Sequence, residues 1–481
     1  MTDLSRKTVS SGFIWKLLER LGAQGISLIV SIILARLLDP SVYGTIALVT
    51  VFTTILQVFV DGGLASALIQ KKNVDNIDYS SVFYFNLLFG LFLYGIMFFA
   101  APFIADFYGY SELVPLVRVL SLMIIISSVK NVQHAYIARN LLFKRFFWAT
   151  LGGTVIAGVV SIIMAYNGFG VWSLVASHLV NMFIDTVILW ITVEWKPQFV
   201  FSSKRLKSLL SYGWKLLCAR MIETFYTECR ALIIGKMYSS SDLAFYNRGR
   251  QYPNLIVKNV DYSVSSVLFP VMSKVQDDVE KCRSIVRRAI TLNTYIIAPS
   301  MMGLAVCAEP FVRLVLTEKW MPCVPYLRIF CFTLAFVTFN TANMNSYRSI
   351  GRSDIYLKIE IIRKTMGIII LIVSMWFGVF WIAMGEVVAT IIAMIVTAHP
   401  NHRFLGYGFL KQLKDVLPCL VLTVIMGIAT YPISLLGLPD ALTLVIQIIV
   451  GVFVYVAGSV VMHIESLHYC KSLILSFIKK K

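Results

Sequence analysis

Residues 81–104 read SVFYFNLLFGLFLYGIMFFAAPFI, an unbroken stretch without a charged side chain. About 20 such residues are enough to cross the hydrocarbon core of a bilayer. The rest of the chain is similar, because 58% of its 481 residues are hydrophobic and only 14% are charged. Roughly a quarter of the residues of a soluble protein are charged. The sequence therefore predicts an all-α polytopic membrane protein.

Further apolar blocks follow one another along the chain, and they predict about fourteen membrane helices. We expect these helices at approximately 12–34, 43–66, 81–104, 113–135, 148–166, 169–193, 209–235, 250–272, 286–307, 326–346, 359–378, 380–398, 415–436 and 441–463. The first, seventh and eighth contain charged residues and are the least typical. No connection exceeds about 20 residues, which is too short for a soluble catalytic domain.

The net charge of +18 is best explained by membrane topology. If the N-terminus is cytoplasmic, about 29 of the 43 Lys and Arg residues fall in cytoplasmic segments and about 8 in external loops, as the positive-inside rule requires. Both termini are therefore expected in the cytoplasm. Nucleic-acid binding is disfavoured, because the basic residues are scattered between apolar blocks and form no single basic face.

An internal repeat divides the chain. Trp15-Lys16-Leu17-Leu18 recurs as Trp214-Lys215-Leu216-Leu217, about 200 positions later, and Arg20 and Arg220 show a similar offset. Six predicted helices separate the copies, so the halves have the same orientation in the membrane and are related by an axis along its normal. We expect an N-terminal lobe at 1–200, a C-terminal lobe at 201–402 and an appended helix pair at 403–481. Two such pseudosymmetric six-helix bundles suggest alternating access, with a substrate cavity at their interface.

Cations inside the predicted membrane helices are costly unless they face water or a partner, so each marks a candidate site. They are Lys16, Arg20, Lys215, Arg220, Arg230 and Lys258. The spacing of Lys16, Glu19 and Arg20 places them on one face of the first helix. A cavity lined by these cations suits an anionic head group, since Arg offers a planar fork to phosphate oxygens. Alternatively, Lys16 and Lys215 lie close enough to helix ends to extend to the membrane surface.

Acids at the same depth are candidates for ion pairs or for coupling to a cation. They are Glu19, Glu223, Asp261, Asp61, Asp185 and Glu386. Glu19 can neutralise a neighbouring cation, and Glu223 and Asp261 can form ion pairs between helices. Asp61 precedes two glycines, so its role can equally be to end or kink a helix. For the isolated Asp185 and Glu386, a hydrogen-bonded helix contact is favoured over coupling.

Signatures of enzymes and metal proteins are absent from the sequence. It contains no HExxH, no Gly-x4-Gly-Lys-Ser/Thr loop, no GxSxG elbow and no Cys-x2-Cys pair. We therefore expect no catalytic residue, metal or cofactor, and interpret His134 and His178 as packing residues. Without an ATP-binding motif, transport has to draw on H⁺, Na⁺, the membrane potential or the substrate's own gradient. Cys307 and Cys323 flank one predicted external loop, where they can pair or stay free.

Strings in the first two helices resemble those of the polysaccharide flippase family. They are Ser11-Gly12-Phe13-x-Trp15, Leu34-Ala35-Arg36-Leu37-Leu38-Asp39-Pro40-Ser41-Val42-Tyr43-Gly44 and Asp61-Gly62-Gly63-Leu64-x3-Leu68-Ile69-Gln70. Phe245-Tyr246-Asn247-Arg248 and Leu268-Phe269-Pro270-x2-Ser273 resemble strings in the second repeat of that family. The similarity extends over essentially the whole chain and is greatest to the WzxC-like branch of the multidrug/oligosaccharidyl-lipid/polysaccharide exporter superfamily.

The resemblance implies a flippase of the bacterial cytoplasmic (inner) membrane, and not an enzyme. Its implied substrate is an undecaprenyl-diphosphate-linked oligosaccharide, moved to the outer leaflet for capsule, exopolysaccharide, lipopolysaccharide or O-antigen synthesis. Implied partners are the lipid bilayer, a polysaccharide polymerase and export machinery. Arg20 and Arg220 best match the family's diphosphate-binding positions, followed by Lys16, Lys215, Arg230 and Lys258.

Two other functions are consistent with a polytopic membrane protein. A cation-coupled multidrug exporter of the same superfamily is expected to have a cavity rich in acids and aromatic residues, and six cations at membrane depth disfavour it. A membrane polysaccharide polymerase or ligase is expected to carry a long extracytoplasmic loop with catalytic Arg or His, for which the chain has no room.

Overall fold

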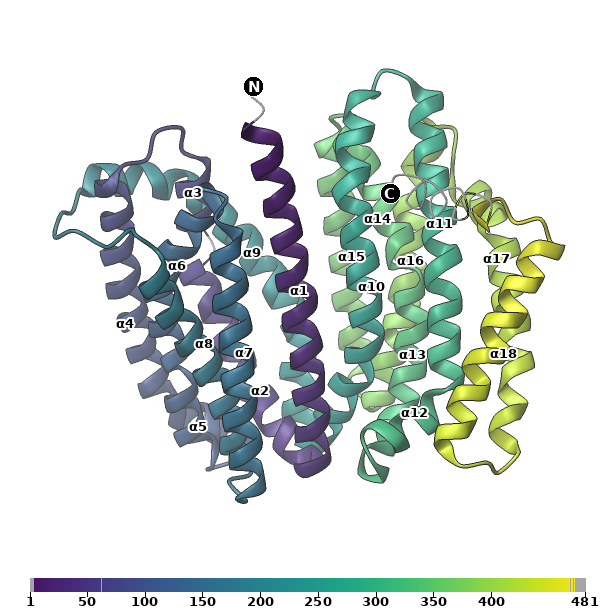
Figure 1. Cartoon of the computed structure of the whole chain (residues 1–481), viewed down its shortest axis with the longest axis horizontal. Helices are drawn as coiled ribbons and strands as arrows, with labels where there is room; N and C mark the ends of the chain where they lie inside the picture. Colours follow the sequence, from purple (N-terminus) through teal and green to yellow (C-terminus); the bar gives the residue numbers. More distant parts are fainter. Residues whose placement is uncertain (1–3, 62, 468, 470, 472–481) are drawn as a thin grey trace. The chain divides into compact units, whose positions relative to one another are not determined.

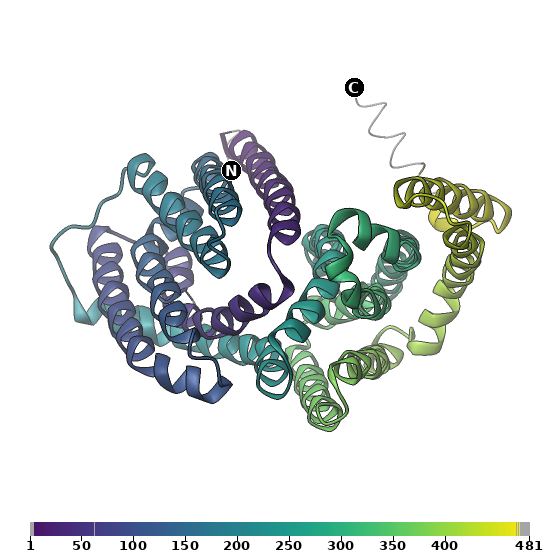
Figure 2. The same cartoon turned by 90° about the horizontal axis from the view of Figure 1, so that it is seen from below.

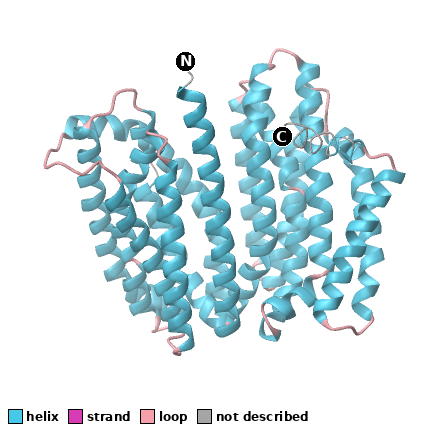
Figure 3. Ribbon diagram, viewed as in Figure 1, coloured by secondary structure: helices cyan, strands magenta, loops and turns pink. Residues whose placement is uncertain are grey.

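Helices form nearly all of the protein. The computed structural model describes residues 4–61, 63–467, 469 and 471, and the regular structure in this part of the chain is entirely helical (Figure 3). The predicted all-α class is therefore confirmed. Within the described residues, 12 spans are long and apolar enough to cross a membrane. The highly charged helices α9 (Ser203–Met237) and α15 (Ser353–Ser374) are not among them. The total of about fourteen and the cytoplasmic termini stay predictions.

The chain folds into two compact units, residues 1–244 and 245–481. Their boundary lies near the start of α10 (Ser240–Lys274). It differs from the predicted lobe boundary at residue 200 because α9 packs on helices of the first unit. The predicted division of the chain at residues 200 and 402 stays a prediction about the repeat.

The first unit consists of long helices joined by short connections (Figure 1). They are α1 (Leu4–Leu37), α2 (Pro40–Asp61), α3 (Leu64–Gln70), α4 (Asn76–Tyr108), α5 (Leu113–Leu120), α6 (Leu122–Arg139), α7 (Phe143–Tyr166), α8 (Val171–Thr192) and α9. α7 packs on both α1 and α8, α6 packs on α4 and α8, and α9 packs on α2. Figure 2 shows the same helices nearly end-on.

A glycine contact brings α3 and α9 together. α2 ends at Asp61 and α3 begins at Leu64, so Gly63 of the Asp61-Gly62-Gly63 string lies where the helix is interrupted. A Cβ atom on Gly63 would lie 2.3 Å from the carbonyl oxygen of Gly213 in α9, well inside van der Waals contact. A side chain at Gly63 would therefore push α9 away from α3.

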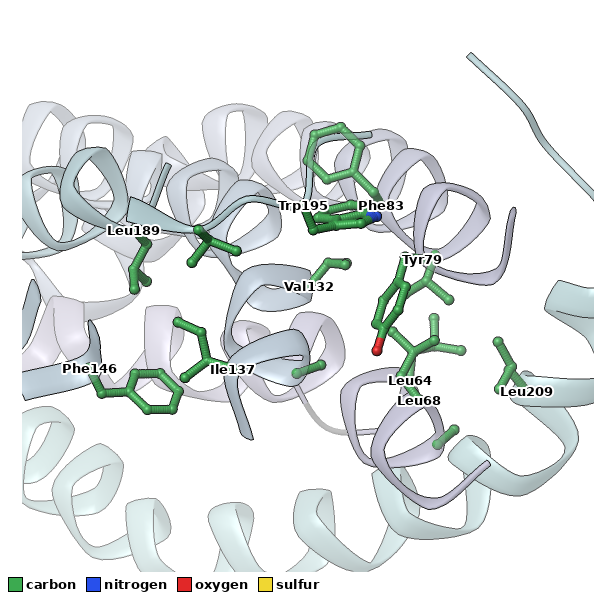
Figure 4. Packing of buried hydrophobic residues seen from close by; sticks show 14 of the residues in the cluster. Leu64, Leu68, Tyr79, Phe83, Val132, Ile137, Phe146, Leu189, Trp195 and Leu209 are labelled. Carbon is green, nitrogen blue, oxygen red and sulfur yellow. The ribbon is translucent and has the colours of Figure 1, made fainter. Parts of the chain in front are cut away.

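An aromatic cluster closes one end of the first unit (Figure 4). The ring centroid of Trp195, in the connection between α8 and α9, lies 5.5 Å from that of Tyr79 and 6.3 Å from that of Phe83, both in α4. Leu64 of α3 and Leu209 of α9 belong to the same buried cluster. Burying aromatic rings of this size contributes several kcal/mol. The cluster therefore holds the start of α9 against α3 and α4.

The second unit is formed by most of α10 and the helices that follow it. They are α11 (Val279–Val306), α12 (Ala308–Val315), η1 (Glu318–Cys323), α13 (Val324–Ala335), α14 (Val337–Ser349), α15, α16 (Val379–Phe404), α17 (Phe409–Thr430), η2 (Tyr431–Leu435) and α18 (Asp440–Val461). α11 packs on α17, and α17 packs on α18. The predicted appended pair, α17 and α18, is thus anchored on α11.

Three predicted helices prove to be broken. The block at 43–66 is divided between α2 and α3, the block at 113–135 between α5 and α6 at Ser121, and the block at 326–346 between α13 and α14 at Phe336. Only the first break coincides with glycines. The other two occur in the fourth block of each predicted repeat, a similarity of backbone geometry that the residues at the breaks do not indicate.

Of the two alternatives for Cys307 and Cys323, the structure shows the free state, because both are buried thiols without a disulfide. Their surroundings differ. Cys307 ends α11 and lines an apolar groove with Phe311 and Tyr455, whereas Cys323 lies beside Arg248. Each thiol is therefore enclosed by its own set of neighbours.

Candidate functional site

One face of α1 packs on α7. The ring centroids of Trp15 and Phe147 lie 5.3 Å apart, and the hydroxyl of Thr150 donates a hydrogen bond of 3.4 Å to the carboxylate of Glu19. The structure thus places Glu19 against α7, as a contact between helices. The side chain of Lys16 lies outside the described residues.

A polar stripe runs along the other side of α1. Arg20, Gln24, Ser27 and Ser31 follow at i, i+4, i+7 and i+11, so they share one face of the helix. At 100° per residue this face is turned by more than 90° from the Glu19 face. Arg20 is half-buried and Ser27 is exposed. A hydrophilic stripe within an apolar span is what a helix needs where it borders water or a polar substrate.

The central part of α9 carries exposed charges. Lys215, Arg220 and Glu223 are all exposed, although they belong to a predicted membrane segment. Arg230 differs because it is buried, with its guanidinium 5.2 Å from the centre of the Tyr226 ring one turn earlier. Lys215, Arg220 and Glu223 are therefore open to the surroundings, whereas Arg230 is enclosed.

The predicted charges of α10 are close together along the helix but differ in exposure. Lys258 is exposed, whereas Asp261, one turn later, is half-buried beside Thr341 of α14. The side chain of Asp61, the remaining acid near a predicted helix end, lies outside the described residues.

Asp185 forms a buried ionic site in the first unit. Lys130 of α6 donates to its carboxylate at 2.9 Å, and His134 Nε2 lies 3.7 Å from the same oxygen. Lys130 and His134 are one turn apart, so both face α8. His134 also contacts the ring of Phe146 edge-on, with centroids 4.8 Å apart. The carboxylate thus ties α8 to α6 and places an imidazole next to an ion pair.

Glu386 forms the corresponding site in the second unit. The hydroxyl of Tyr246 donates to its carboxylate at 2.5 Å, and Arg250 donates to the same oxygen at 3.3 Å. Both donors belong to α10 and again lie one turn apart. The Tyr246 ring packs edge-on against Phe330 of α13, with centroids 5.1 Å apart. The carboxylate thus ties α16 to α10.

Sequence reasoning identified both acids and missed their cations. Lys130 lies near the end of the segment predicted at 113–135, and Arg248 and Arg250 lie at the start of the segment predicted at 250–272, where a basic residue is expected from topology alone. Arg248 is buried, 4.8 Å above the ring of Trp320. A usable signal existed in the offset of about 200 positions between Asp185 and Glu386, which matches the repeat. The i, i+4 spacing of Lys130 and His134 was a second signal.

The described residues contain no group of three or more His, Cys, Asp or Glu side chains that could hold a metal ion. The exposed guanidinium and ammonium groups can bind anions. The carboxylates next to an imidazole or a phenol can exchange protons.

Two family models match the chain. The model described as "Polysaccharide biosynthesis protein" matches residues 33–325, which is more than half of the chain. The model described as "Lipid II flippase MurJ" matches residues 236–450.

Curated relatives have low identity and broad coverage. The succinoglycan biosynthesis transport protein ExoT of Rhizobium meliloti is 26% identical over 70% of this chain and 68% of its own length. The lipopolysaccharide biosynthesis protein WzxC of Escherichia coli is 24% identical over 89% of both chains. The teichuronic acid biosynthesis protein TuaB of Bacillus subtilis is 25% identical over 63% of both.

Solved structures share the fold. The lipid II flippase MurJ in an inward closed conformation superposes with a TM-score of 0.77 at 18% identity, covering 94% of this chain and 99% of the other. An inward-facing multidrug transporter of the MATE family superposes with a TM-score of 0.59 at 17% identity, covering 82% and 94%.

Proposed function

Because the chain belongs to the polysaccharide biosynthesis protein family, we propose that it is a flippase for a lipid-linked oligosaccharide. The protein is a multi-pass protein of the bacterial inner membrane, and its relatives include a succinoglycan biosynthesis transport protein and a lipopolysaccharide biosynthesis protein. The proposed substrate is an oligosaccharide repeat unit on undecaprenyl diphosphate. The proposed reaction carries it from the cytoplasmic to the outer leaflet by alternating access, for later use by a polymerase and export machinery.

The observation that supports this proposal best is the exposure of Lys215, Arg220 and Glu223 along α9, which contains the membrane segment predicted at 209–235 but is too charged to be among the 12 apolar spans. An Arg or Lys facing lipid at the bilayer centre costs at least about 2.5 kcal/mol. Exposed charges within a membrane segment are therefore expected to border water. The polar stripe of α1, which contains Arg20, has the same requirement. A hydrated path with two Arg side chains suits a substrate whose head is a diphosphate.

The proposed roles of the cations follow from their exposure. Arg20 and Arg220 bind the diphosphate directly, while the exposed Lys215 and Lys258, together with Lys16, raise the local positive potential. Arg230 is enclosed beside Tyr226, so its proposed role is to hold α9 in place more than to contact the substrate. Asp185 and Glu386 are the proposed sites of coupling to an ion or to the membrane potential, because each carboxylate is buried within an ion pair.

Both alternative functions agree less well with the structure. A drug exporter for cationic compounds would repel its substrate with exposed Lys215 and Arg220. A polymerase or ligase needs a catalytic loop, and the longest connection between described helices is the segment 193–202.

A vesicle assay tests the proposal. The purified chain is reconstituted with undecaprenyl-diphosphate-linked oligosaccharide, and a lectin outside the vesicles reports the sugar that appears on the outer leaflet. We expect the Arg20→Ala/Arg220→Ala double variant to slow appearance by about tenfold or more, because two charge-assisted contacts to phosphate are lost. Lys207→Ala is the matched control, since Lys207 is an exposed cation near the start of the same helix α9.

Full activity in the correctly folded double variant would show that the cations do not bind the diphosphate. Lack of any flipping by the parent chain, together with export of a cationic dye from loaded vesicles, would replace the proposal with the drug-exporter function.

A further inference from the structure

A polar cavity lies between α11 and the residues that follow α18 in the second unit. It has a volume of about 470 Å³ and is lined by Ser284, Arg287, Arg288 and Thr291 of α11 and by Glu465 and Tyr469, which follow α18. Two guanidinium groups, one carboxylate and several hydroxyls therefore surround one space. None of these residues belongs to the sites described above.

The two arginines are in different electrostatic situations. Arg287 is already neutralised, because its Nε donates to Asp415 of α17 at 3.0 Å and its Nη2 lies 3.7 Å from Glu465. Arg288 has no ion pair with a carboxylate among the described residues. Its guanidinium lies 4.9 Å from the centre of the Tyr469 ring, which orients it without removing its charge. Arg288 is thus an exposed lining cation whose charge no carboxylate among the described residues neutralises.

The position along the helices matches the membrane surface. Arg287 and Arg288 lie at the start of the membrane segment predicted at 286–307, and Glu465 and Tyr469 lie just after the segment predicted at 441–463. Farther along α11 and α18, a hydrogen bond joins the two helices, since the Tyr295 hydroxyl donates to Ser459 at 3.1 Å. The predicted segments therefore place the cavity at the depth of the lipid head groups, on the side that the positive-inside rule assigns to the cytoplasm.

We propose that this cavity binds the phosphate of an anionic phospholipid head group in the cytoplasmic leaflet. Arg288 supplies the uncompensated charge, Arg287 is held in place by its two carboxylates, and Ser284 and Tyr469 add hydroxyl donors. A basic pocket between membrane helices at the cytoplasmic surface is a typical head-group site. Bound lipid would join the segment after α18 to α11. This site is separate from the one proposed for the flipped substrate and does not depend on it.

Lipid retention tests the proposal. The full chain is reconstituted in nanodiscs that contain phosphatidylcholine and phosphatidylglycerol, and native mass spectrometry counts the phosphatidylglycerol that remains bound after extraction. We expect Arg288→Ala to retain about fivefold less, since one cation near an anionic lipid surface contributes on this scale. Arg288→Gln removes the charge but keeps a polar side chain with an amide donor, so it tests the charge even if the alanine variant folds poorly.

Arg403→Ala is the matched control, because Arg403 is an exposed arginine near the end of α16 that does not line the cavity. It should retain phosphatidylglycerol like the parent. Equal losses in Arg403→Ala and both Arg288 variants would overturn the proposal, since they would show general attraction to a basic surface.

A second arm separates the lipid from free phosphate. In nanodiscs of phosphatidylcholine alone, inorganic phosphate at millimolar concentration should leave the thermal unfolding temperature of the parent unchanged. A rise that is seen in the parent and lost in Arg288→Gln would overturn the lipid assignment and identify the cavity as a site for soluble phosphate. The assay contains no oligosaccharide, so its outcome is independent of flipping.

Discussion

Asp185 in the first unit and Glu386 in the second lie about 200 positions apart, at matching places in the predicted repeat, yet different helices neutralise them. Lys130 of the fourth predicted membrane segment pairs with Asp185, whereas Arg250, at the start of the eighth, pairs with Glu386. The second segment of the first repeat carries no cation at the position that matches Arg250. The repeat has therefore kept the acid and changed the source of its counter-charge.

The chemistry of the two sites differs as well. The second group at Asp185 is an imidazole, whereas the second group at Glu386 is the Tyr246 phenol. Imidazole is the side chain that changes charge near neutral pH, while phenol and guanidinium groups do not. The first unit thus holds an ion pair beside an imidazole, and the second holds an ion pair beside a phenol.

The largest expected difference concerns stability. In the Lys130–Asp185 pair the side chains are 16% and 9% exposed, against 35% and 13% for Arg250–Glu386. We expect Asp185→Ala to lower the free energy of unfolding by about 3 kcal/mol, because it leaves an enclosed ammonium group unpaired. Glu386→Ala should lower it by about half as much, because Arg250 can reach solvent. Denaturant unfolding of the purified chain in detergent measures both.

Ile191→Ala is the control for that comparison, because Ile191 is a highly exposed residue of α8, the helix that carries Asp185. It should change the free energy of unfolding little in detergent. Equal losses for Asp185→Ala and Glu386→Ala would mean that exposure of the cation does not control the cost.

A second experiment separates the pair energy from the cost of leaving a charge unpaired. In a double-mutant cycle, Lys130→Met combined with Asp185→Asn should recover part of the stability that each substitution loses, with a coupling of about 1–3 kcal/mol. The cycle of Arg250→Met with Glu386→Gln should give a smaller coupling, because Arg250 also lies 5.5 Å from the centre of the Phe330 ring. A larger coupling in the second unit would reverse the order proposed for the two sites.

The comparison also shows how much of the protein could be predicted from sequence. Apolar blocks identify the membrane helices because burial in lipid acts on every residue of a span. An isolated acid such as Asp185 stands out in these blocks because a charged side chain is costly in lipid. Its partner Lys130 does not stand out, because it lies near a block end, where a basic residue is expected from topology alone.

A break in a helix can likewise be predicted only where the residues at the break favour it. The break after α2 could be anticipated from Gly62 and Gly63, which tolerate it. The breaks at Ser121 and Phe336 could not, because neither residue disfavours a helix strongly. They arise from tertiary packing. Helix periodicity separates Glu19 from the stripe of Arg20, but tertiary packing decides that α7 covers the Glu19 face.

A third, smaller effect concerns pH. His134→Gln replaces the imidazole next to Asp185 with a neutral amide, so the flipping rate should vary less between about pH 5 and 8 than in the parent. Tyr246→Phe should leave the shape of the pH profile unchanged, although it loses a hydrogen bond to Glu386. The vesicle assay at a series of pH values measures both. An unchanged profile in His134→Gln would remove the distinction between the two sites.

The smallest effect comes from an exposed ion pair of the first unit, which provides a reference for the buried ones. Arg205, near the start of α9, donates to Asp75, and the two side chains are 38% and 51% exposed. This hydrogen bond from Arg205 is the main cause that holds the pKa of Asp75 below its usual value. The pair therefore stabilises the fold above the ordinary pKa of about 3.9, and the contribution is lost as the pH falls through the lowered pKa.

Arg205→Ala should accordingly cost less than about 1 kcal/mol at neutral pH, as exposed pairs do, and should make stability fall less steeply between about pH 5 and 3. Lys204→Ala is the control, because Lys204 is an exposed neighbour and forms no ion pair among the described residues. Unfolding of the parent and both variants over this pH range measures the difference. A cost as large as that of Asp185→Ala would mean that exposure does not set the strength of ion pairs in this chain, and the contrast between Asp185 and Glu386 would then need another cause.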